Sequence, residues 1–294
     1  MESVRILLVV ATQEGWSVHH LDVKSAFLNG DLKEEVYVQQ PPDFAISGEE
    51  GKVYRLRKAL YGLREMGFQQ SAHETAMYRQ GSERAVLLVG VYVDDLIIAG
   101  ADAEEVEKFK AVMKHRFDMS DLGLLSFYLG IEVRQDASSI TLRQTHYAKW
   151  ILELGDMVGC NPAHTPMEEK LKLSRDSEAE EVDPTHYRRL VGSLRYLVHT
   201  RPDLAFAVGY VSQFVERPTA EHLQAIKRVL CYIAGTLDYG LHYKRASCAM
   251  RFIGYYDSDL AGDVDTSKST SGTMFFLGDF LVCWQSTKQT VVAL

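Results

Sequence analysis

The sequence predicts an α+β protein built from antiparallel strands and amphipathic helices. Two observations indicate this class. Short runs rich in β-forming residues come in pairs around turn signals, as at 86–92 and 96–99. Apolar residues recur at helical spacing in other segments, such as 103–117. The composition agrees, because 46% apolar and 24% charged residues in a chain of 294 residues suit a globular protein with a sizeable core. The length favours two domains.

The first part of the chain mixes helices with short strands. A helix is predicted over residues 2–14, where apolar residues lie at helical spacing, and a strand over 17–23 leads into Asp22. The later helix begins at a capping-box pattern formed by Asp102 and Glu105. The other predicted elements of this part are a turn at Asn29, Gly30 and Asp31, strands near 36–38 and 53–56, a hairpin of 86–92 and 96–99, and the helix over 103–117.

The second part is predicted to contain a helical region between two sheet regions. Residues 165–184 are polar and acidic, which is typical of a linker or an exposed loop. The other predicted elements are a hairpin of 126–134 and 139–143, helices over 146–157, 185–199, 203–215 and 219–234, and strands in 240–294 with apolar runs at 251–256 and 273–284.

Charge and cysteine content narrow the class of protein. The net charge of −8 counts mildly against a nucleic-acid enzyme, which more often has a basic surface. Four cysteines without a CxxC pair predict reduced thiols, no zinc site and an intracellular location in the cytoplasm or nucleus. No signal peptide is predicted. The stretch AVLLVGVYVDDLIIAGA is rejected as a membrane span, because each mid-bilayer aspartate would cost roughly 2.5–3.5 kcal/mol.

Three aspartates form the candidate catalytic site. Asp22 ends a predicted strand, and Asp94 and Asp95 lie at the tip of a predicted hairpin with apolar flanks. Phosphoryl transfer requires neutralisation of developing charge, which two Mg²⁺ ions about 3.5–4 Å apart provide when carboxylates hold them. The alternative interpretation is that Asp94 and Asp95 form an ordinary polar turn and that Asp22 is an ordinary strand-end residue.

Several motifs together resemble the copia-type retrotransposon reverse transcriptase, part of a Pol polyprotein. They are LDVKSAFLNGDLKEEVYVQQPPDF, KALYGLR, YVDDLIIAG, YLGIEV, YRRLVGSLRYL, TRPDLAFAV and YDSDLAGD with STSGTMFFLGD. The resemblance covers nearly the whole chain. It implies an RNA-directed DNA polymerase that uses two Mg²⁺ ions, an RNA or DNA template with a primer, and deoxynucleoside triphosphates, with no membrane partner.

The resemblance assigns roles to individual residues. Asp22 and Asp94 match the metal-binding aspartates, Asp95 matches the partner in the YxDD turn, and the Val23 carbonyl is a further candidate metal ligand. The other implied roles fall to Phe27 beneath the incoming sugar, Tyr92 and Val93 beside the primer terminus, Tyr128, Leu129, Gly130, Ile131 and Glu132 in a primer-grip hairpin, and Asp257 as the first metal ligand of a ribonuclease H domain.

For most of these residues a structural role is the alternative, namely a core Phe27, buried strand residues at Tyr92 and Val93, and an ordinary hairpin at 128–132. Arg57, Lys58 and Arg64 are candidates for phosphate contact, with a solvated surface role as the alternative. The histidines have no ligand spacing and receive no predicted role. Leu260 stands where the family pattern has Trp.

The predicted layout is an antiparallel palm-like sheet with helices, a helical connection and an incomplete ribonuclease H-like sheet. The predicted domains are 1–164 for the palm and primer grip without fingers, 165–184 for an acidic linker, 185–239 for the connection and 240–294 for the truncated ribonuclease H-like domain.

The chain departs from the family pattern at three places. It begins after the fingers region, YGLR runs directly into EMGFQQSAHE where the pattern has a Gln-x-Pro-Arg stretch and a Trp-containing helix, and it stops at QTVVAL before the ribonuclease H glutamate. We therefore expect impaired polymerisation and no ribonuclease H activity, since a two-metal site needs more than one ligand. The alternative function is a non-catalytic retrotransposon relic or a nucleic-acid-binding fragment.

Overall fold

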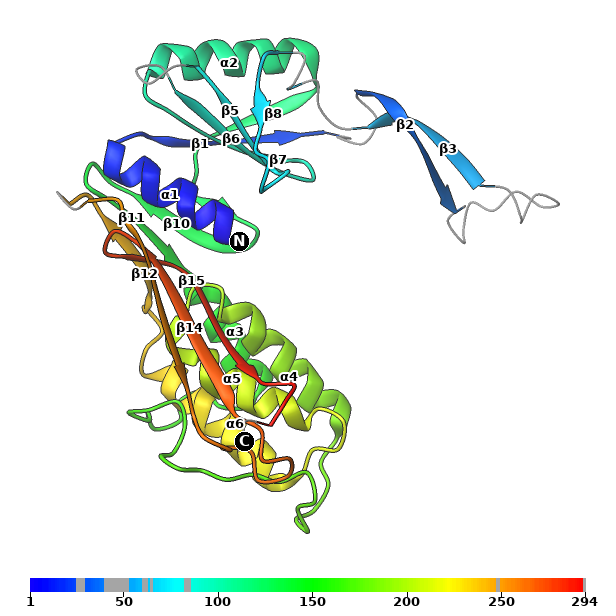
Figure 1. Cartoon of the computed structure of the whole chain (residues 1–294), viewed down its shortest axis with the longest axis vertical. Helices are drawn as coiled ribbons and strands as arrows, with labels where there is room; N and C mark the ends of the chain where they lie inside the picture. The colour runs from blue at the N-terminus through cyan, green and yellow to red at the C-terminus, as the bar shows by residue number, and fades with distance from the viewer. Residues whose placement is uncertain are drawn as a thin grey trace. The chain divides into compact units, whose positions relative to one another are not determined.

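The structure is a computed structural model that describes residues 1–24, 30–39, 53–59, 63, 66–81, 86–246 and 249–292, with the backbone alone described for 30–39 and 53–59. The chain divides into two compact units (Figure 1). The smaller unit comprises residues 14–125 and the larger unit comprises residues 1–13 and 126–294. Each unit is described by itself below.

The smaller unit is built on a six-stranded antiparallel sheet with the strand order β4-β5-β6-β7-β1-β8. Its strands are β1 (Val18–Val23), β4 (Gln69–Gln70), β5 (Met77–Gln80), β6 (Leu87–Tyr92), β7 (Asp95–Gly100) and β8 (Met119–Leu124). Strands β2 (Gly30–Gln39) and β3 (Val53–Ala59) form a separate two-stranded sheet. The longest apolar stretch forms β6 and β7, as predicted, and among the described residues no helix has the length and apolarity needed to cross a bilayer.

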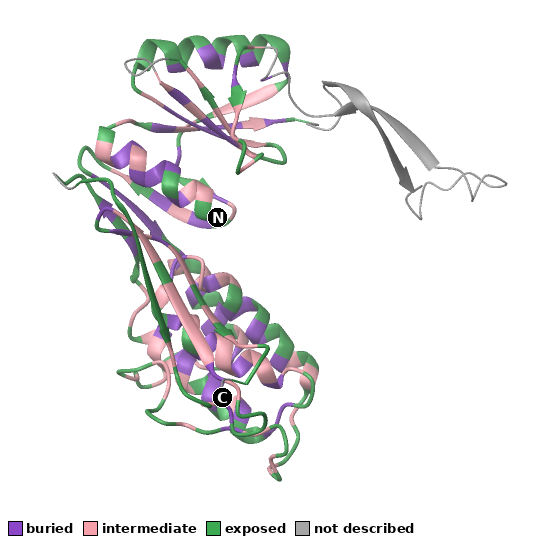
Figure 2. Ribbon diagram, in the orientation of Figure 1, coloured by how far each residue is buried: buried purple, intermediate pink, exposed green. Residues whose placement is uncertain are grey.

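Helix α2 (Ala103–Arg116) covers one face of this sheet (Figure 1). Its apolar side chains at helical spacing, Val106, Phe109 and Met113, are buried against strand residues such as Leu96, while its opposite side is exposed (Figure 2). The side chain of Asp102 accepts a hydrogen bond from the backbone N–H of Glu104 at 2.8 Å and so begins the helix. The predicted helix and its buried face are confirmed.

The larger unit combines two antiparallel sheets with a group of packed helices. One sheet has the order β12-β11-β10-β9 and the other has the order β13-β14-β15. The strands are β9 (Phe127–Tyr128), β10 (Ile131–Gln135), β11 (Ser139–Arg143), β12 (Gly240–Lys244), β13 (Phe252–Ser258), β14 (Thr270–Leu277) and β15 (Phe280–Lys288). The helices are α1 (Glu2–Glu14), α3 (Thr145–Leu154), α4 (Pro184–Leu197), α5 (Ala205–Val211) and α6 (Ala220–Ala234), with 3₁₀ turns at Pro202–Leu204 and Ser212–Phe214.

The core of the larger unit lies between α3, α4, α5 and α6. Leu194 on α4 and Ile226 on α6 are fully buried there, and the buried Tyr187 hydroxyl donates to the Val211 carbonyl at 2.8 Å. Helix α6 begins at Thr219 with a capping box in which His222 takes the N3 position. The four predicted helices of this region, and the predicted cap at Thr219, are confirmed, although the helix predicted at 203–215 begins and ends in 3₁₀ turns.

One predicted element needs correction, three strands were missed, and the predicted acidic loop is confirmed. The predicted strand 126–134 is divided, because Leu129 and Gly130 have φ of 49° and 76° and form a turn between β9 and β10. Strands β4, β5 and β8 were not predicted at all. Within the segment 165–183 one isolated bridge joins Glu181 to Thr219, and the segment contains no helix or longer strand.

Candidate active site

The two predicted aspartate segments meet at one end of the six-stranded sheet. In the antiparallel pairing of β1 with β7, Asp22 lies directly opposite Asp95. The backbone N–H of Val23 donates to the carbonyl of Asp94 at 2.8 Å. Opposite residues in an antiparallel pair have side chains on the same face, with Cβ atoms about 4.5–5.5 Å apart. The sheet therefore brings together the acids that are distant in sequence.

A tight turn between β6 and β7 contains Asp94. Tyr92 pairs with Asp95, so Val93 and Asp94 alone form the β6–β7 turn. Val93 has φ of 56°, which a β-branched residue rarely adopts and which costs on the order of 1–3 kcal/mol. Tyr92, Val93 and Asp94 are exposed, so the alternative interpretation of Tyr92 and Val93 as buried strand residues is wrong. Such strain typically persists where a turn has to hold functional groups in place.

The apolar residues next to Asp22 and Asp95 are buried and hold β1 and β7 in the core. Leu21 and Val23 on β1 are buried, and so are the β7 residues from Leu96 to Ala99. Asp22 and Asp95 are half-buried between these flanks and the open end of the sheet. The acids thus sit on a rigid support while remaining accessible, as a site for a charged ligand requires.

Sequence reasoning missed His20. Its Nε2 lies 2.6 Å from Oδ1 of Asp95, in the geometry of an ion pair. His20 precedes Asp22 by two residues on β1, so both side chains point to the same face of the sheet. The alternation of the strand is the only sequence signal for this contact, and it becomes useful only once the register with β7 is known.

The fit to a divalent cation is partial. Carboxylate oxygens are the ligands that Mg²⁺ prefers, and Asp22 and Asp94 supply them from adjacent chain segments. However, no group of three or more His, Cys, Asp or Glu side chains within the described ranges is arranged to hold a metal ion. The Oδ1 atom of Asp95 is bonded to His20, which leaves its second carboxylate oxygen as a candidate ligand beside Asp22 and Asp94.

Several residues that were predicted to contact the nucleotide or phosphate are not described by the structure. Phe27 and Arg64 lie outside the described residues, and so do the side chains of Arg57 and Lys58. Their predicted roles stay predictions.

The predicted primer-grip residues belong to the larger unit, whereas the acids belong to the smaller unit. Tyr128 is buried and pairs with Ile131 across the turn of Leu129 and Gly130. The hydroxyl of Tyr196 donates to the Leu129 carbonyl. Gly130 combines a φ of 76° with a position where an added Cβ would lie 2.7 Å from that hydroxyl, so glycine is required there.

Glu132 follows this turn on β10. It accepts hydrogen bonds from the backbone N–H and the Nδ1 of His146. This contact ties the strand to the beginning of α3.

Asp257 lies on β13, where all but the last residue of the strand are exposed. It lines a pocket of about 520 Å³ together with aromatic residues that include Phe206 and Tyr256. Its Oδ1 accepts from the backbone N–H of Ser258, and the next acid along, Asp259, accepts from the N–H of Thr270. The predicted metal role of Asp257 is not tested by these contacts.

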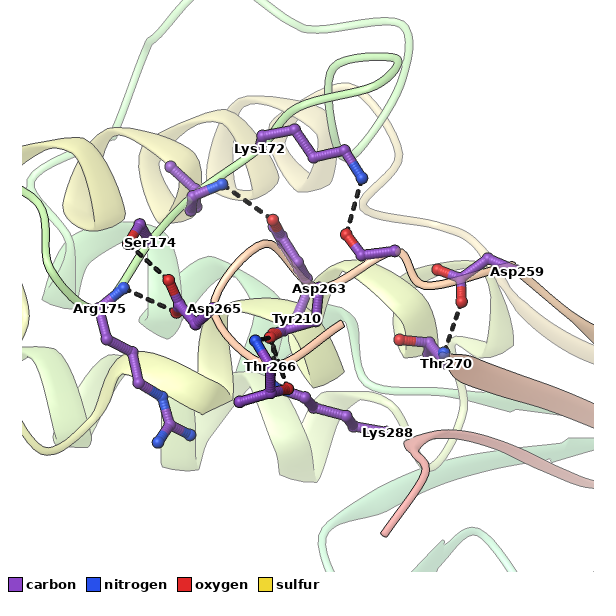
Figure 3. A network of polar contacts seen from close by, with 12 residues as sticks. Lys172, Ser174, Arg175, Tyr210, Asp259, Asp263, Asp265, Thr266, Thr270 and Lys288 are labelled. Carbon is purple, nitrogen blue, oxygen red and sulfur yellow. Dashed lines mark hydrogen bonds and ion pairs between the residues drawn. The ribbon is translucent and has the colours of Figure 1, made fainter. Parts of the chain in front are cut away.

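The loop after β13 is fastened to the segment 172–175 (Figure 3). Asp265 accepts from the Ser174 hydroxyl and from the backbone N–H of Arg175. Nearby, Asp263 binds Lys288 and Thr266. Burial alone would raise the pKa of Asp263, but the hydrogen bonds from Lys288 and Thr266 outweigh it and hold that pKa below its ordinary value.

Comparison with known proteins adds independent information. Residues 1–169 match the model of the family described as reverse transcriptase (RNA-dependent DNA polymerase). The chain is 38% identical to the retrovirus-related Pol polyproteins from transposons RE1 and RE2 of Arabidopsis thaliana, over 98% of its length. It is 36% identical, over its whole length, to the corresponding polyprotein from transposon TNT 1-94 of Nicotiana tabacum.

These relatives are much longer than the chain, which spans 20% to 24% of their length. The alignment with the Nicotiana tabacum protein runs over 319 positions although the chain has 294 residues. That relative therefore contains residues with no counterpart here.

Proposed function

Because the chain belongs to the reverse transcriptase (RNA-dependent DNA polymerase) family, we propose that the β1 and β6–β7 strand ends form the catalytic centre of an RNA-directed DNA polymerase. The observation that supports this most is the register that places Asp22 opposite Asp95, with Val23 bonded to the Asp94 carbonyl. This register brings the two acidic segments together at one end of the six-stranded sheet.

The proposed reaction is nucleotidyl transfer. The primer 3′-hydroxyl gives its proton to water and its oxygen forms a bond to the α-phosphorus of a deoxynucleoside triphosphate, while the bond to the bridging oxygen breaks and pyrophosphate leaves. Mg²⁺ bound at the site would supply neutralisation of the charge that develops on the phosphate. Asp22 and Asp94 would hold this cation through their carboxylates, and the Val23 carbonyl would be a further ligand.

The family resemblance and the solvent exposure of the turn residues indicate which side chains contact the substrates. The exposed Tyr92 and Val93, next to Asp94 in the turn, are placed to contact the primer terminus and the nucleotide. Phe27 selects deoxynucleotides, because a ring beneath the sugar leaves no room for a 2′-hydroxyl. Tyr128, Leu129 and Gly130 contact the primer. A template with a primer and deoxynucleoside triphosphates are therefore the proposed partners.

A non-catalytic relic or nucleic-acid-binding fragment is the second candidate function. It is favoured by the absence, among the described side chains, of a three-residue group suited to a metal. The stretch that is missing after YGLR points in the same direction. We propose that polymerisation is impaired relative to longer relatives.

Primer extension separates the two candidates. Purified chain is incubated with Mg²⁺, deoxynucleotides and an RNA template annealed to a labelled DNA primer. We expect weak, Mg²⁺-dependent extension that Asp94→Asn reduces by at least about a hundredfold, since a metal ligand is lost. Asp118→Asn, which changes an exposed acid in the same unit, is the matched control and retains the signal. Equal extension by the chain and by Asp94→Asn would remove the polymerase proposal.

A further inference from the structure

Two consecutive histidines on β1 have different partners. His19 faces α2, where its Nδ1 lies 2.8 Å from Nζ of the buried Lys110. His20 faces the opposite side of the sheet, where its Nε2 lies 2.6 Å from Oδ1 of Asp95. The two imidazoles are one residue apart and similarly placed along the strand. Only the second one contacts an acid of the candidate active site.

The contact of His20 with Asp95 has a defined direction. An ionised carboxylate has no hydrogen to donate, so Nε2 carries the hydrogen and donates it to Oδ1. A distance of 2.6 Å is typical of a strong hydrogen bond to an ionised group. The side chain of His20 is 11% exposed and that of Asp95 is 22% exposed, so water competes weakly for the bond.

The pairing of β1 with β7 places the bond beside the candidate active site. Asp95 lies opposite Asp22, and His20 lies two residues before Asp22 on the same face of β1. The imidazole therefore holds the Asp95 carboxylate on the side of the sheet that also carries Asp22. In general, carboxylates that bind a metal are themselves held by a second hydrogen bond, and removal of that outer partner weakens metal affinity or activity about 10–100-fold.

We propose that His20 is a positioning residue of the carboxylate site, which orients Asp95 beside Asp22 through the Nε2–Oδ1 hydrogen bond. This inference rests on the proposed function, because it gives Asp95 a place at the cation site. It adds a residue to that site which does not touch the substrate itself. The role requires a hydrogen-bond donor at the position of Nε2, and a glutamine amide can supply such a donor.

Binding of Mn²⁺ to the full chain tests the proposal without any need for polymerase activity. Free Mn²⁺ is followed by electron paramagnetic resonance during a titration, with circular dichroism to confirm the fold of each variant. His20→Leu, which removes the donor, is expected to weaken Mn²⁺ binding by about tenfold or more. His20→Gln is expected to retain most of the affinity. His19→Gln, on the other face of the strand, is the matched control and should bind as the unchanged chain does.

The outcomes separate this inference from the proposed function. If Asp94→Asn abolishes Mn²⁺ binding but His20→Leu leaves it unchanged, the cation site stands and the role of His20 is overturned. If His20→Gln and His20→Leu weaken binding equally, the donor role is likewise overturned. If Asp94→Asn has no effect on Mn²⁺ binding, the cation site of the proposed function fails and the role of His20 fails with it. Should His20→Leu not fold, His20→Ser, whose hydroxyl is too short to reach Asp95, replaces it.

Discussion

His222 shows how one buried imidazole joins three segments of the larger unit. It is fully buried and stacks on Phe214 with ring centroids 4.0 Å apart. Its Nδ1 accepts from the backbone N–H of Thr219 at 3.0 Å, and its Nε2 lies 3.0 Å from the Ser174 carbonyl. The neutral ring, with hydrogen on Nε2, satisfies both contacts. Protonation of Nδ1 would break the first of them.

The stability of the chain should therefore fall in mild acid. Burial lowers the pKa of His222, although the Ser174 carbonyl, Glu221 and Asp265 act against this shift, and burial likewise lowers the pKa of His19 and His199. The folded-state pKa then lies below the unfolded value of about 6.5, and the unfolded chain binds more protons as the pH falls. The stabilisation is complete above that value and is lost as the pH decreases through it.

Urea unfolding at about pH 7.5 and about pH 5.5 measures this effect. The midpoint is expected to be lower at the acidic pH. His222→Gln should show a smaller difference between the two conditions, because one of the three histidines no longer titrates. An unchanged difference would show that His222 makes no contribution.

Arg201 is a second residue whose role is structural. It is buried, it bonds to Asp203 through both Nε and Nη2, and it also donates to the carbonyl and hydroxyl of Thr236. Its guanidinium lies 5.6 Å from the ring of Tyr232. These contacts account for the TRPD motif as a structural feature of the fold.

Removal of Arg201 should destabilise the larger unit strongly. Arg201→Ala removes the ion partner of Asp203, which keeps the hydrogen bond from Tyr232. The change is expected to cost about 3 kcal/mol, the low end for a broken buried pair, because Asp203 is 32% exposed. Arg217 forms an exposed ion pair with Glu181, so Arg217→Ala is the matched control and should cost at most about 1 kcal/mol. Chemical denaturation gives both values. Similar costs for the two variants would contradict the assigned role of Arg201.

At the scale of elements, α2 illustrates what local sequence can determine. Its buried face and the cap at Asp102 are both local properties, and these two features occur as predicted. The capping box is only half formed, because Glu105 accepts from Lys108 at 2.7 Å in a contact within the helix. The side chain that caps the beginning of α2 is therefore that of Asp102.

Loss of this cap gives a measurable prediction. Asp102→Ala is expected to lower the free energy of unfolding by about 1 kcal/mol, because the N–H of Glu104 loses its acceptor. Asp102→Asn keeps an acceptor of the same length and should remain within a few tenths of a kcal/mol of the original chain. Hydrogen exchange of the first turn of α2 is expected to increase in the alanine variant alone. Equal stability of the two variants would refute the cap.

Elements that depend on distant partners could not be predicted in the same way. Strands β4 and β8 are short or weakly patterned, and their existence depends on the strand beside them in the sheet. The turn at Leu129 and Gly130 was missed because a leucine with positive φ has no sequence signal, whereas the Tyr196 contact that holds it is distant along the chain.

The same limit applies to the candidate site. The meeting of Asp22 with Asp94 could be predicted, because each ends a strand or occupies a hairpin tip. The bond between His20 and Asp95 could not, because it needs the register of β1 against β7.

At the scale of the whole molecule, the net charge of −8 restricts how nucleic acid can bind. An acidic chain repels a phosphate backbone overall, so binding requires a local group of cations. From the sequence, Arg57, Lys58 and Arg64 are the proposed contacts. If they neutralise phosphates, binding releases the counterions of the nucleic acid, and the affinity must fall as the salt concentration rises because each release then gains less free energy.

Fluorescence anisotropy with a labelled primer–template duplex tests this proposal over a range of salt concentrations. The logarithm of the affinity is expected to fall linearly with the logarithm of the salt concentration. Lys58→Ala should reduce the magnitude of the slope by about one, as for the loss of one phosphate contact. The highly exposed Lys170 serves as the matched control, and Lys170→Ala should leave the slope unchanged. An affinity that does not respond to salt would argue against phosphate contacts.

Strand β13 lies at the end of its sheet, and exposed aromatic residues, including Phe252, Tyr255 and Tyr256, cover much of it. An exposed edge of this kind is a template on which a second molecule can add its own strand, and thus a starting point for aggregation. Purified chain should accordingly precipitate or form oligomers as its concentration rises. A lysine introduced at Tyr255 would hinder strand addition, so stocks for titration and spectroscopy are best kept dilute or prepared with that change.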